Sequence, residues 1–249
     1  TAIHEVGTSL CHAALRCVKF KNRPAHADQL HVELWWKGNN LARDAGTYSY
    51  NAPPPWQNGL DSTRVHNTVT IDSRDQMQRV SRFLWLDRAY ATWLKTDTPE
   101  AISAVLHNYN RSGISHQSTL TRTRNGFSIL DELIPKTDDS TIHEFCLHWL
   151  LPDWRWQIED SILTLQHDHD QVELFVEARS TRSGDRMSSQ DFSIIRAGQT
   201  LAGQRQDELL GWESDTYGEK HPVLSFSVTY MCAGPIKITT EWNLNDEGI

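Results

Sequence analysis

The sequence predicts an all-β fold, a large antiparallel β-sandwich with few or no helices. Short segments in which apolar and polar residues alternate recur along the chain, and β-branched and aromatic residues fill them. Gly, Asn, Asp and Pro separate these segments at a spacing of roughly 8–12 residues, without clear helical segments between them. Strands arranged in this way favour a sandwich over an α/β sheet.

The expected strands follow one another as alternating runs that end at turn residues. Turn pairs such as Asn125-Gly126 and Gly234-Pro235 supply the breaks. Two further segments, residues 9–20 and 197–212, carry weak helical signals, and the first of them alternates like a strand as well. The expected strands are residues 30–36, 66–72, 127–134, 162–166, 171–178, 223–232 and 236–242.

Length and composition favour one folded unit. The chain has 249 residues, of which 38% are hydrophobic and 22% charged, so we expect a single sandwich domain over residues 1–249. The net charge of -8 argues against a dedicated binder of nucleic acid or of anionic membranes. No apolar run approaches the ~20 residues of a membrane-spanning helix.

The histidine, tryptophan and cysteine content gives only weak indications of function. The 12 His and 10 Trp suggest metal and carbohydrate chemistry without establishing either. The cysteines form no C-x-x-C pair, which argues against a cysteine zinc site. Ordinary buried thiols are favoured, although an even number also permits two disulfides. The cysteines are Cys11, Cys17, Cys146 and Cys232.

The most informative stretch runs from residue 23 to residue 76. Within it, His26 precedes one expected strand, Asp44 follows the turn after that strand, and His66 opens the next strand. If these segments are neighbours in one sheet, two imidazoles and a carboxylate converge at one rim, which is a suitable ligand set for zinc. The spacing is not that of a local metal motif, and by itself it favours surface histidines and a turn aspartate.

Three stretches in series carry a resemblance to a known family. They are HADQLHVELWWKG (residues 26–38), LARDAGTYSYN (41–51) and TRVHNTVTIDSRDQ (63–76), and weaker matches continue to the last strands. Over nearly its whole length the chain resembles the C-terminal domain of the heparinase II/III-like family of polysaccharide lyases. The three stretches together are more specific than any one of them.

The resemblance implies a fold, an activity and a metal. Lyases of this family join an N-terminal (α/α) toroid to a C-terminal β-sandwich, and they cleave uronic-acid polysaccharides such as heparan sulfate or alginate by β-elimination. The resemblance implies a zinc ion, usually structural, bound by His26, Asp44 and His66. It also implies that an acidic polysaccharide and the toroid domain are partners, and that the protein is bacterial and periplasmic or secreted. The strand-rich chain leaves no room for the toroid, so we expect the main catalytic residues to lie outside it.

One departure from the family concerns a histidine. Lyases of this group often contain H-x-H-x-D, in which the first histidine acts in catalysis, and Pro24 stands at that position here. The role of that histidine is absent or transferred, for example to His31 or to the other domain. The alternative interpretation is therefore a non-catalytic carbohydrate-binding or structural sandwich.

β-Elimination beside a uronate requires a group that neutralises the carboxylate, a base for the C5 proton and an acid for the leaving oxygen. Arginine, asparagine and tyrosine side chains are suited to these roles. We expect Tyr48, Tyr50, Arg64 and Asn67 to line the sandwich side of a substrate cleft. Trp56, in a loop with three consecutive prolines, is the candidate for stacking on a sugar.

Each of these residues also has a simpler explanation. The two tyrosines are two residues apart, so they would pack on one face of a strand. Arg64 would pair with Asp61 or Asp44, and Asn67 would satisfy a turn. The sequence leaves both interpretations open for each residue.

Overall fold

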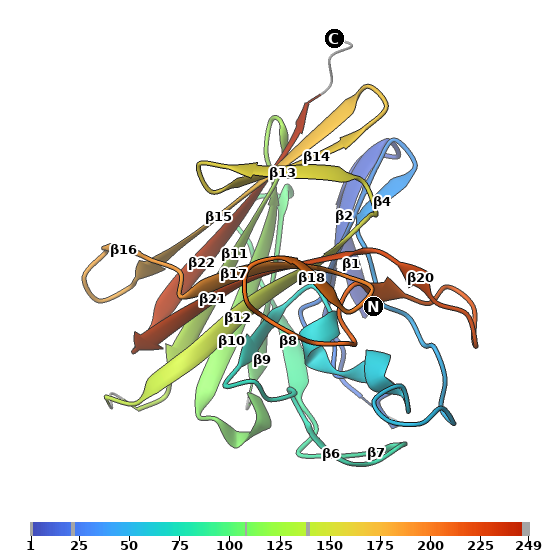
Figure 1. Ribbon diagram of the computed structural model, residues 1–249. Helices are drawn as coiled ribbons and strands as arrows, with labels where there is room; N and C mark the ends of the chain where they lie inside the picture. Colours follow the sequence, from blue (N-terminus) through green and yellow to red (C-terminus); the bar gives the residue numbers. More distant parts are fainter. Residues whose placement is uncertain (1, 21–22, 108, 138–139, 246–249) are drawn as a thin grey trace.

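The computed structural model describes residues 2–20, 23–107, 109–137 and 140–245 (Figure 1). The fold is the expected antiparallel β-sandwich, and its helical elements within these ranges are three short 3₁₀ turns. No helix in this part of the chain has the length and apolar character needed to cross a membrane. The turns are η1 (Gly59–Asp61), η2 (Thr63–Val65) and η3 (Tyr109–Arg111).

The first layer of the sandwich is one nine-stranded antiparallel sheet. Its strands are β8 (Tyr90–Leu94), β9 (Ala101–His107), β10 (Ile114–Arg122), β11 (Gly126–Pro135), β13 (Arg155–Glu159), β14 (Ile162–His167), β15 (Asp170–Ser180), β16 (Arg186–Met187) and β22 (Ile236–Asn245). The order is β13-β14-β15-β22-β11-β10-β9-β8, and β16 pairs with the end of β15. Alternate residues of β10 and β22 are buried, so one face of this sheet is covered.

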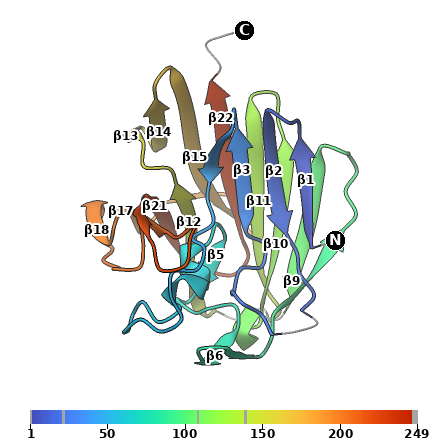
Figure 2. The same ribbon diagram turned by 90° about the vertical axis from the view of Figure 1, so that its right-hand side faces the viewer.

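The second layer consists of two smaller sheets that cover this face. One contains β1 (Ile3–Gly7), β2 (Cys11–Arg16), β3 (Val32–Trp36) and β4 (Asn39–Ala42), and Figure 2 shows it in front of β9–β11. The other has the order β18-β17-β21-β12-β5. Its strands are β5 (Val69–Ile71), β12 (Ile142–Leu151), β17 (Asp191–Arg196), β18 (Gln199–Ala202) and β21 (Leu224–Ala233). Two short hairpins, β6 (Gln78–Ser81) with β7 (Leu84–Leu86) and β19 (Trp212–Glu213) with β20 (His221–Pro222), stand outside the layers.

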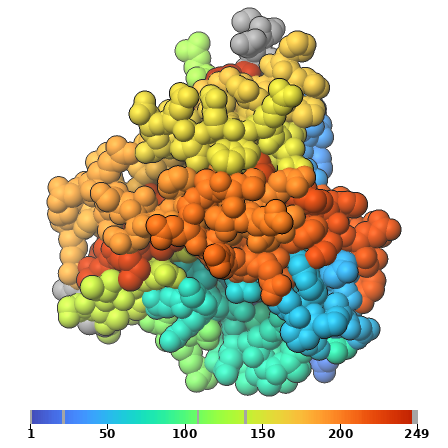
Figure 3. Space-filling view, viewed as in Figure 1, coloured from blue at the N-terminus to red at the C-terminus, as the bar shows by residue number. Residues whose placement is uncertain are grey.

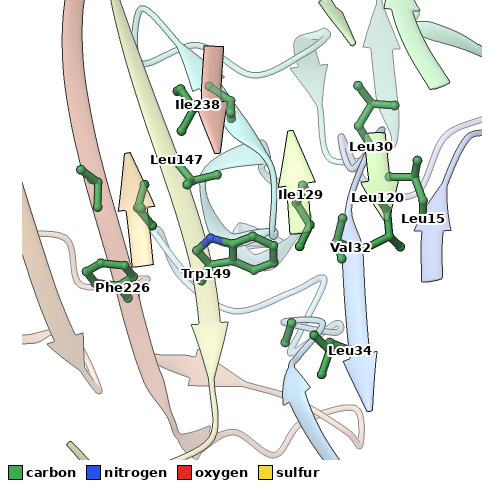
Figure 4. Packing of buried hydrophobic residues seen from close by; sticks show 14 of the residues in the cluster. Leu15, Leu30, Val32, Leu34, Leu120, Ile129, Leu147, Trp149, Phe226 and Ile238 are labelled. Atoms are coloured by element: carbon green, nitrogen blue, oxygen red, sulfur yellow. The ribbon is translucent and has the colours of Figure 1, made fainter. Parts of the chain in front are cut away.

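Apolar side chains from all three sheets meet between the two layers (Figure 4). Val32 comes from the four-stranded sheet, Ile129 from the nine-stranded sheet and Trp149 from the five-stranded sheet. Trp149 and Trp242 pack edge to face, with ring centroids 5.3 Å apart. Burial of one large apolar side chain contributes about 1.5–3 kcal/mol. This shared core therefore holds both smaller sheets against the large one.

Loops cover the outer face of the five-stranded sheet as well. The segment 203–211, which follows β18, lies against it, and the Gly211 N–H donates a hydrogen bond to Ser225 Oγ at 2.8 Å. In Figure 3 this orange segment crosses the middle of the molecule. As a result, most of β12 and the first half of β21 are buried on both faces.

All seven expected strands are present, as β3, β5, β11, β14, β15, β21 and β22. The sequence pattern does not predict β12, because a strand buried on both faces has no polar alternation. Neither weakly helical segment forms a helix, since the first contains β2 and the second contains β18. The four cysteines are unpaired.

Candidate metal centre

The two smaller sheets meet at the segment that holds His66 and Asn67. Asn67 is 1% exposed. Its Nδ2 donates to the carbonyl oxygens of Val32 (2.8 Å) and Arg43 (2.9 Å), and its Oδ1 accepts the Leu150 N–H (2.6 Å). The side chain thus joins β3, the end of β4 and β12. These bonds occupy both N–H groups of the buried amide, so the structure gives Asn67 a role in stabilising the junction.

Three loops bring His26, Asp44 and His66 together at this junction. His26 lies before β3, Asp44 follows β4, and His66 lies between η2 and β5. One ligand atom from each residue lies within 4.8 Å of the other two. Because β4 and β5 belong to different sheets, the residues do not meet at the rim of one sheet, as the sequence suggested. They meet where two sheets adjoin.

His66 is fully buried and makes no side-chain hydrogen bond within the described residues. Neither ring nitrogen has a partner there, and Asp44 Oδ2 lies 3.8 Å from Nδ1, beyond hydrogen-bond range. Burial lowers the pKa of His66, so the imidazole is neutral and offers a lone pair. Buried polar groups are normally hydrogen-bonded, which makes this ring unusual. Its lone pair is available to a metal ion.

Asp44 presents one carboxylate oxygen to the histidines and ties the other to the backbone. Its Oδ1 accepts the Gly46 N–H at 2.7 Å. Burial raises the pKa of Asp44, but the imidazoles around it, led by His66, and the Gly46 N–H outweigh that effect and lower the pKa overall. Gly46 has φ 69°, and a Cβ there would overlap the Ser214 carbonyl oxygen. Glycine is therefore required in the turn that holds the carboxylate.

His31 supports the site from within the fold. Its Nδ1 accepts the Asn67 N–H at 3.0 Å, so the neutral ring carries its proton on Nε2, 3.7 Å from Asp44 Oδ2. Burial lowers the pKa of His31, which favours this neutral form. Since His31 is 2% exposed, it is not placed to touch a substrate in place of the histidine that Pro24 replaces. No local sequence pattern indicates that His31 faces Asp44, because that contact depends on how the two sheets adjoin.

The three residues fit a zinc ion. Two imidazoles and one carboxylate form a donor set that zinc accepts, and its fourth position can take water. Donors on a tetrahedral zinc are about 3.4 Å apart, close to the 3.8 Å between His66 Nδ1 and Asp44 Oδ2. His26 Nε2 lies 2.9 Å from Thr47 Oγ1, which orients its ring 5.2 Å from the ring of His66.

A cavity of about 270 Å³ adjoins His26. Tyr50 and Phe83 pack edge to face in its wall, with ring centroids 5.2 Å apart. Arg82 and Phe83 form the turn of the β6–β7 hairpin, and the sequence does not reveal that this hairpin lies beside His26. The lining residues are Arg23, Pro24, Ala25, His26, Tyr50, Asn58, Arg82 and Phe83.

Tyr48 and Trp56 lie around Lys220 instead. Lys220 Nζ is 3.0 Å from the ring centroid of Trp56, 3.9 Å from that of Trp212 and 5.4 Å from that of Tyr48. One face of Trp56 is thus occupied by an ammonium group, which removes that face from sugar stacking. Tyr48 and Tyr50 do not lie in a strand and contact different neighbours, so their expected packing on one strand face is wrong.

Arg64 pairs with Asp207 rather than with Asp61 or Asp44. Its Nε lies 3.3 Å from Asp207 Oδ2, while Asp61 pairs with Arg79 at 2.9 Å. The partner of Arg64 is therefore distant in sequence. Of the five predicted substrate residues, all of them in the described part of the chain, Tyr50 alone lines the cavity beside His26.

Residues 11–242 match the sequence profile of the family described as Heparinase II/III-like, C-terminal. No curated protein matches the chain in sequence. Among solved structures, a heparinase III gene product with methylated lysines has a TM-score of 0.69 at 17% identity, covering 98% of this chain and 34% of its own. Heparan sulfate lyase HepC from Pedobacter heparinus has a TM-score of 0.68 at 17% identity, covering 96% of this chain and 34% of its own.

A further heparinase III structure has a TM-score of 0.69 at 13% identity, covering 94% of this chain and 33% of its own. At such identities these similarities establish the fold. The chain spans about a third of the length of each of these proteins. The family profile, in contrast, matches most of the chain in sequence. The chain therefore belongs to the heparinase II/III-like family of polysaccharide lyases and corresponds to its C-terminal domain.

Proposed function

We propose that the chain is the C-terminal β-sandwich of a polysaccharide lyase that cleaves uronic-acid polysaccharides, of the heparan sulfate or alginate type, by β-elimination. The observation that carries the proposal is the group of His26, Asp44 and His66 beside a cavity lined by two arginines and two aromatic rings. Family membership supports the reaction class. The greater length of the solved relatives supports an N-terminal toroid domain that supplies the rest of the active site.

In this proposal His26, Asp44 and His66 hold a structural zinc ion. When bound, zinc supplies positive charge and fixes the mutual positions of its ligands. The ligands belong to the loops before β3, after β4 and before β5. Fixing those loops also fixes Pro24 and Tyr50, which lie near the ligands in sequence and line the adjoining cavity.

Arg82 and Arg23 are the groups we assign to the uronate carboxylate. A guanidinium binds a carboxylate through two parallel hydrogen bonds, and neutralising that charge makes the C5 proton more acidic. Tyr50 and Phe83 offer apolar ring surface to the sugar. The base that takes the C5 proton and the acid that protonates the leaving oxygen would come from the toroid.

Pro24 favours one alternative, a carbohydrate-binding sandwich without a catalytic role. It lines the cavity where related lyases often carry a histidine, and its side chain has no proton to exchange. In this alternative the sandwich binds acidic polysaccharide, and the protein that contains it produces no cleavage.

Elemental analysis of the purified chain tests the metal site. We expect one zinc ion per chain, and its loss in a His26→Ala, His66→Ala double variant. The matched control removes two exposed histidines outside the site, His167 and His169, and should keep the zinc. Stoichiometric zinc in the first variant would rule out this ligand set.

Absorbance of the unsaturated product, with heparan sulfate and alginate as substrates, tests the reaction. We expect no robust turnover by the chain alone, and turnover by a longer protein that includes the toroid.

Polysaccharide binding to the chain, measured by calorimetry, tests the cavity. Binding should weaken in Arg82→Gln and persist in Arg155→Gln, which changes an exposed arginine away from the cavity. Robust turnover by the chain alone would contradict the need for the toroid. Binding without turnover in the longer protein would favour the non-catalytic alternative.

A further inference from the structure

A second cavity, of about 540 Å³, lies between the two layers at an edge far from the metal centre. Leu163 of β14 and Val176 of β15 line it from the large sheet, and Phe226, Val228 and Tyr230 of β21 line it from the small sheet. In Figure 1 the neighbouring strand β16 lies at the left of the molecule, and β4, which precedes Asp44, lies at the right. The volume is in the usual range for small-molecule sites, about 300–1,000 Å³.

The strand pairing explains why the sandwich is open here. β14 pairs with β15 as far as Phe175, and β16 pairs with β15 from Ala178 onward. Between these points, no strand in the described ranges covers Val176 and Glu177 on that edge. Val176, Phe226 and Val228 are accordingly 7–8% exposed, whereas most of the core lies at 0–1%. The cavity therefore leads from the surface, at the uncovered edge of β15, into the apolar interior.

Tyr230 brings a hydroxyl group to the wall of this cavity. It is 2% exposed, and its hydroxyl makes no hydrogen bond to the described residues. Burial raises the pKa of Tyr230 to about 12, so the hydroxyl stays protonated and can donate. The hydroxyl oxygen itself keeps some solvent access, and Tyr230 lines the cavity. An oxygen acceptor on a ligand in the cavity would give the hydroxyl a hydrogen-bond partner.

The charged groups that line the cavity are Glu177 and Arg186, and Arg179 pairs with Glu177 from outside the lining. Arg179 donates to both carboxylate oxygens of Glu177, at 3.1 and 3.3 Å. Arg186, which lines the cavity with Glu177, lies 3.9 Å from the same carboxylate, and its side chain is 56% exposed. Two guanidinium groups thus share one carboxylate. This balance favours an anionic head group at the opening.

We propose that this cavity binds an amphiphilic monoanion, a compact apolar body with one carboxylate. The apolar body lies among Val176, Phe226 and Val228, and the carboxylate accepts hydrogen bonds from Tyr230 and Arg186. This site is independent of the metal centre, since the two share no residue.

Calorimetric titration of the chain with sodium octanoate, and with 1-octanol as the uncharged probe of equal length, tests the proposal. We expect octanoate to bind one per chain and at least tenfold more tightly than octanol. Arg186→Gln should weaken octanoate binding about tenfold and leave octanol binding unchanged. The reason is that, of the two parts of the ligand, the guanidinium contacts only the carboxylate. Tyr230→Phe should weaken octanoate several-fold.

Arg155→Gln provides the matched control, because this exposed arginine on β13 does not line the cavity. It should leave octanoate binding unchanged. Absence of octanoate binding at millimolar concentration would overturn the proposal. Equal binding of octanoate and octanol, or equal weakening by Arg155→Gln and Arg186→Gln, would overturn it as well.

Discussion

His66 and His116 are both fully buried beside an aspartate, and they differ in what their ring nitrogens contact. His116 Nε2 lies 2.8 Å from Asp131 Oδ1, between neighbouring strands of the nine-stranded sheet. His66 Nδ1 lies 3.8 Å from Asp44 Oδ2, and neither of its nitrogens has a partner in the described chain. Regular strands bring a pair into direct contact, whereas the loops at the junction hold the donors apart. The contact with Asp131 thus satisfies one ring nitrogen of His116 and leaves its Nδ1 without a hydrogen-bond partner in the described chain, whereas both nitrogens of His66 lack one, which leaves His66 suited to an ion.

The largest effect is expected for the pair of His116 and Asp131. His116→Ala should lower the free energy of unfolding by about 3–5 kcal/mol, because it leaves the buried Asp131 without its partner. Urea denaturation measures this loss. Elemental analysis should still find one zinc per chain, and loss of zinc would show that the two clusters are not independent.

Removal of zinc by a chelator tests the cluster of His26, Asp44 and His66. With free zinc about 100-fold above its Kd, binding adds about 2.7 kcal/mol to the free energy of unfolding. Removing zinc with EDTA should therefore destabilise the chain by about this amount. The same treatment of the His26→Ala, His66→Ala double variant should change nothing. An equal effect of EDTA on both proteins would place the stabilising metal elsewhere.

His31 provides a finer test, because it contacts Asp44 rather than the ion. Side chains that orient a metal ligand without touching the metal typically contribute 10–100-fold in metal affinity. His31→Asn retains an acceptor for the Asn67 N–H but loses the N–H that faces Asp44, so we expect about tenfold weaker zinc binding at unchanged stoichiometry. His31→Gln, which restores a donor farther along the side chain, should lose less. Competition with a chromophoric chelator measures both, and equal affinities would contradict this role.

The smallest effect concerns Lys220, which lies outside both clusters. Lys220→Met keeps the apolar stem and removes the charge above Trp56, so we expect a loss of about 1 kcal/mol in the free energy of unfolding. Zinc content should not change. If the variant also binds polysaccharide more tightly, Trp56 becomes a sugar platform once its face is exposed. Unchanged binding would confirm that Trp56 has only a packing role.

Much of the fold follows from alternation, because a strand with one covered face shows it in sequence. β11, β15 and β22 were predictable for this reason. β12 was not predictable, since loops around Gly211 cover its outer face. With both faces covered, the strand has no regular polar positions to alternate with the apolar ones. Short strands such as β6 and β7 carry too few residues for a pattern.

The candidate site was only partly predictable. His26, Asp44 and His66 precede or follow strands, so position along the chain and family resemblance select them. The contacts of His31 and Asn67 depend on how two sheets adjoin, which no local pattern records. The same holds for the pairing of Arg64 with Asp207 and for the placement of Lys220 over Trp56, which join segments far apart in sequence.

The bonds of Asn67 also determine how independently the two smaller sheets can open. Its amide joins the backbone of Val32 and Arg43 on one sheet to that of Leu150 on the other. A fluctuation that separates the two sheets must break the bonds of Asn67 to one of them. Amide hydrogens of β3 and β12 should therefore exchange with solvent through one shared opening event and show similar protection. Similar protection of the two strands would show that one asparagine couples the small sheets into a single cooperative unit.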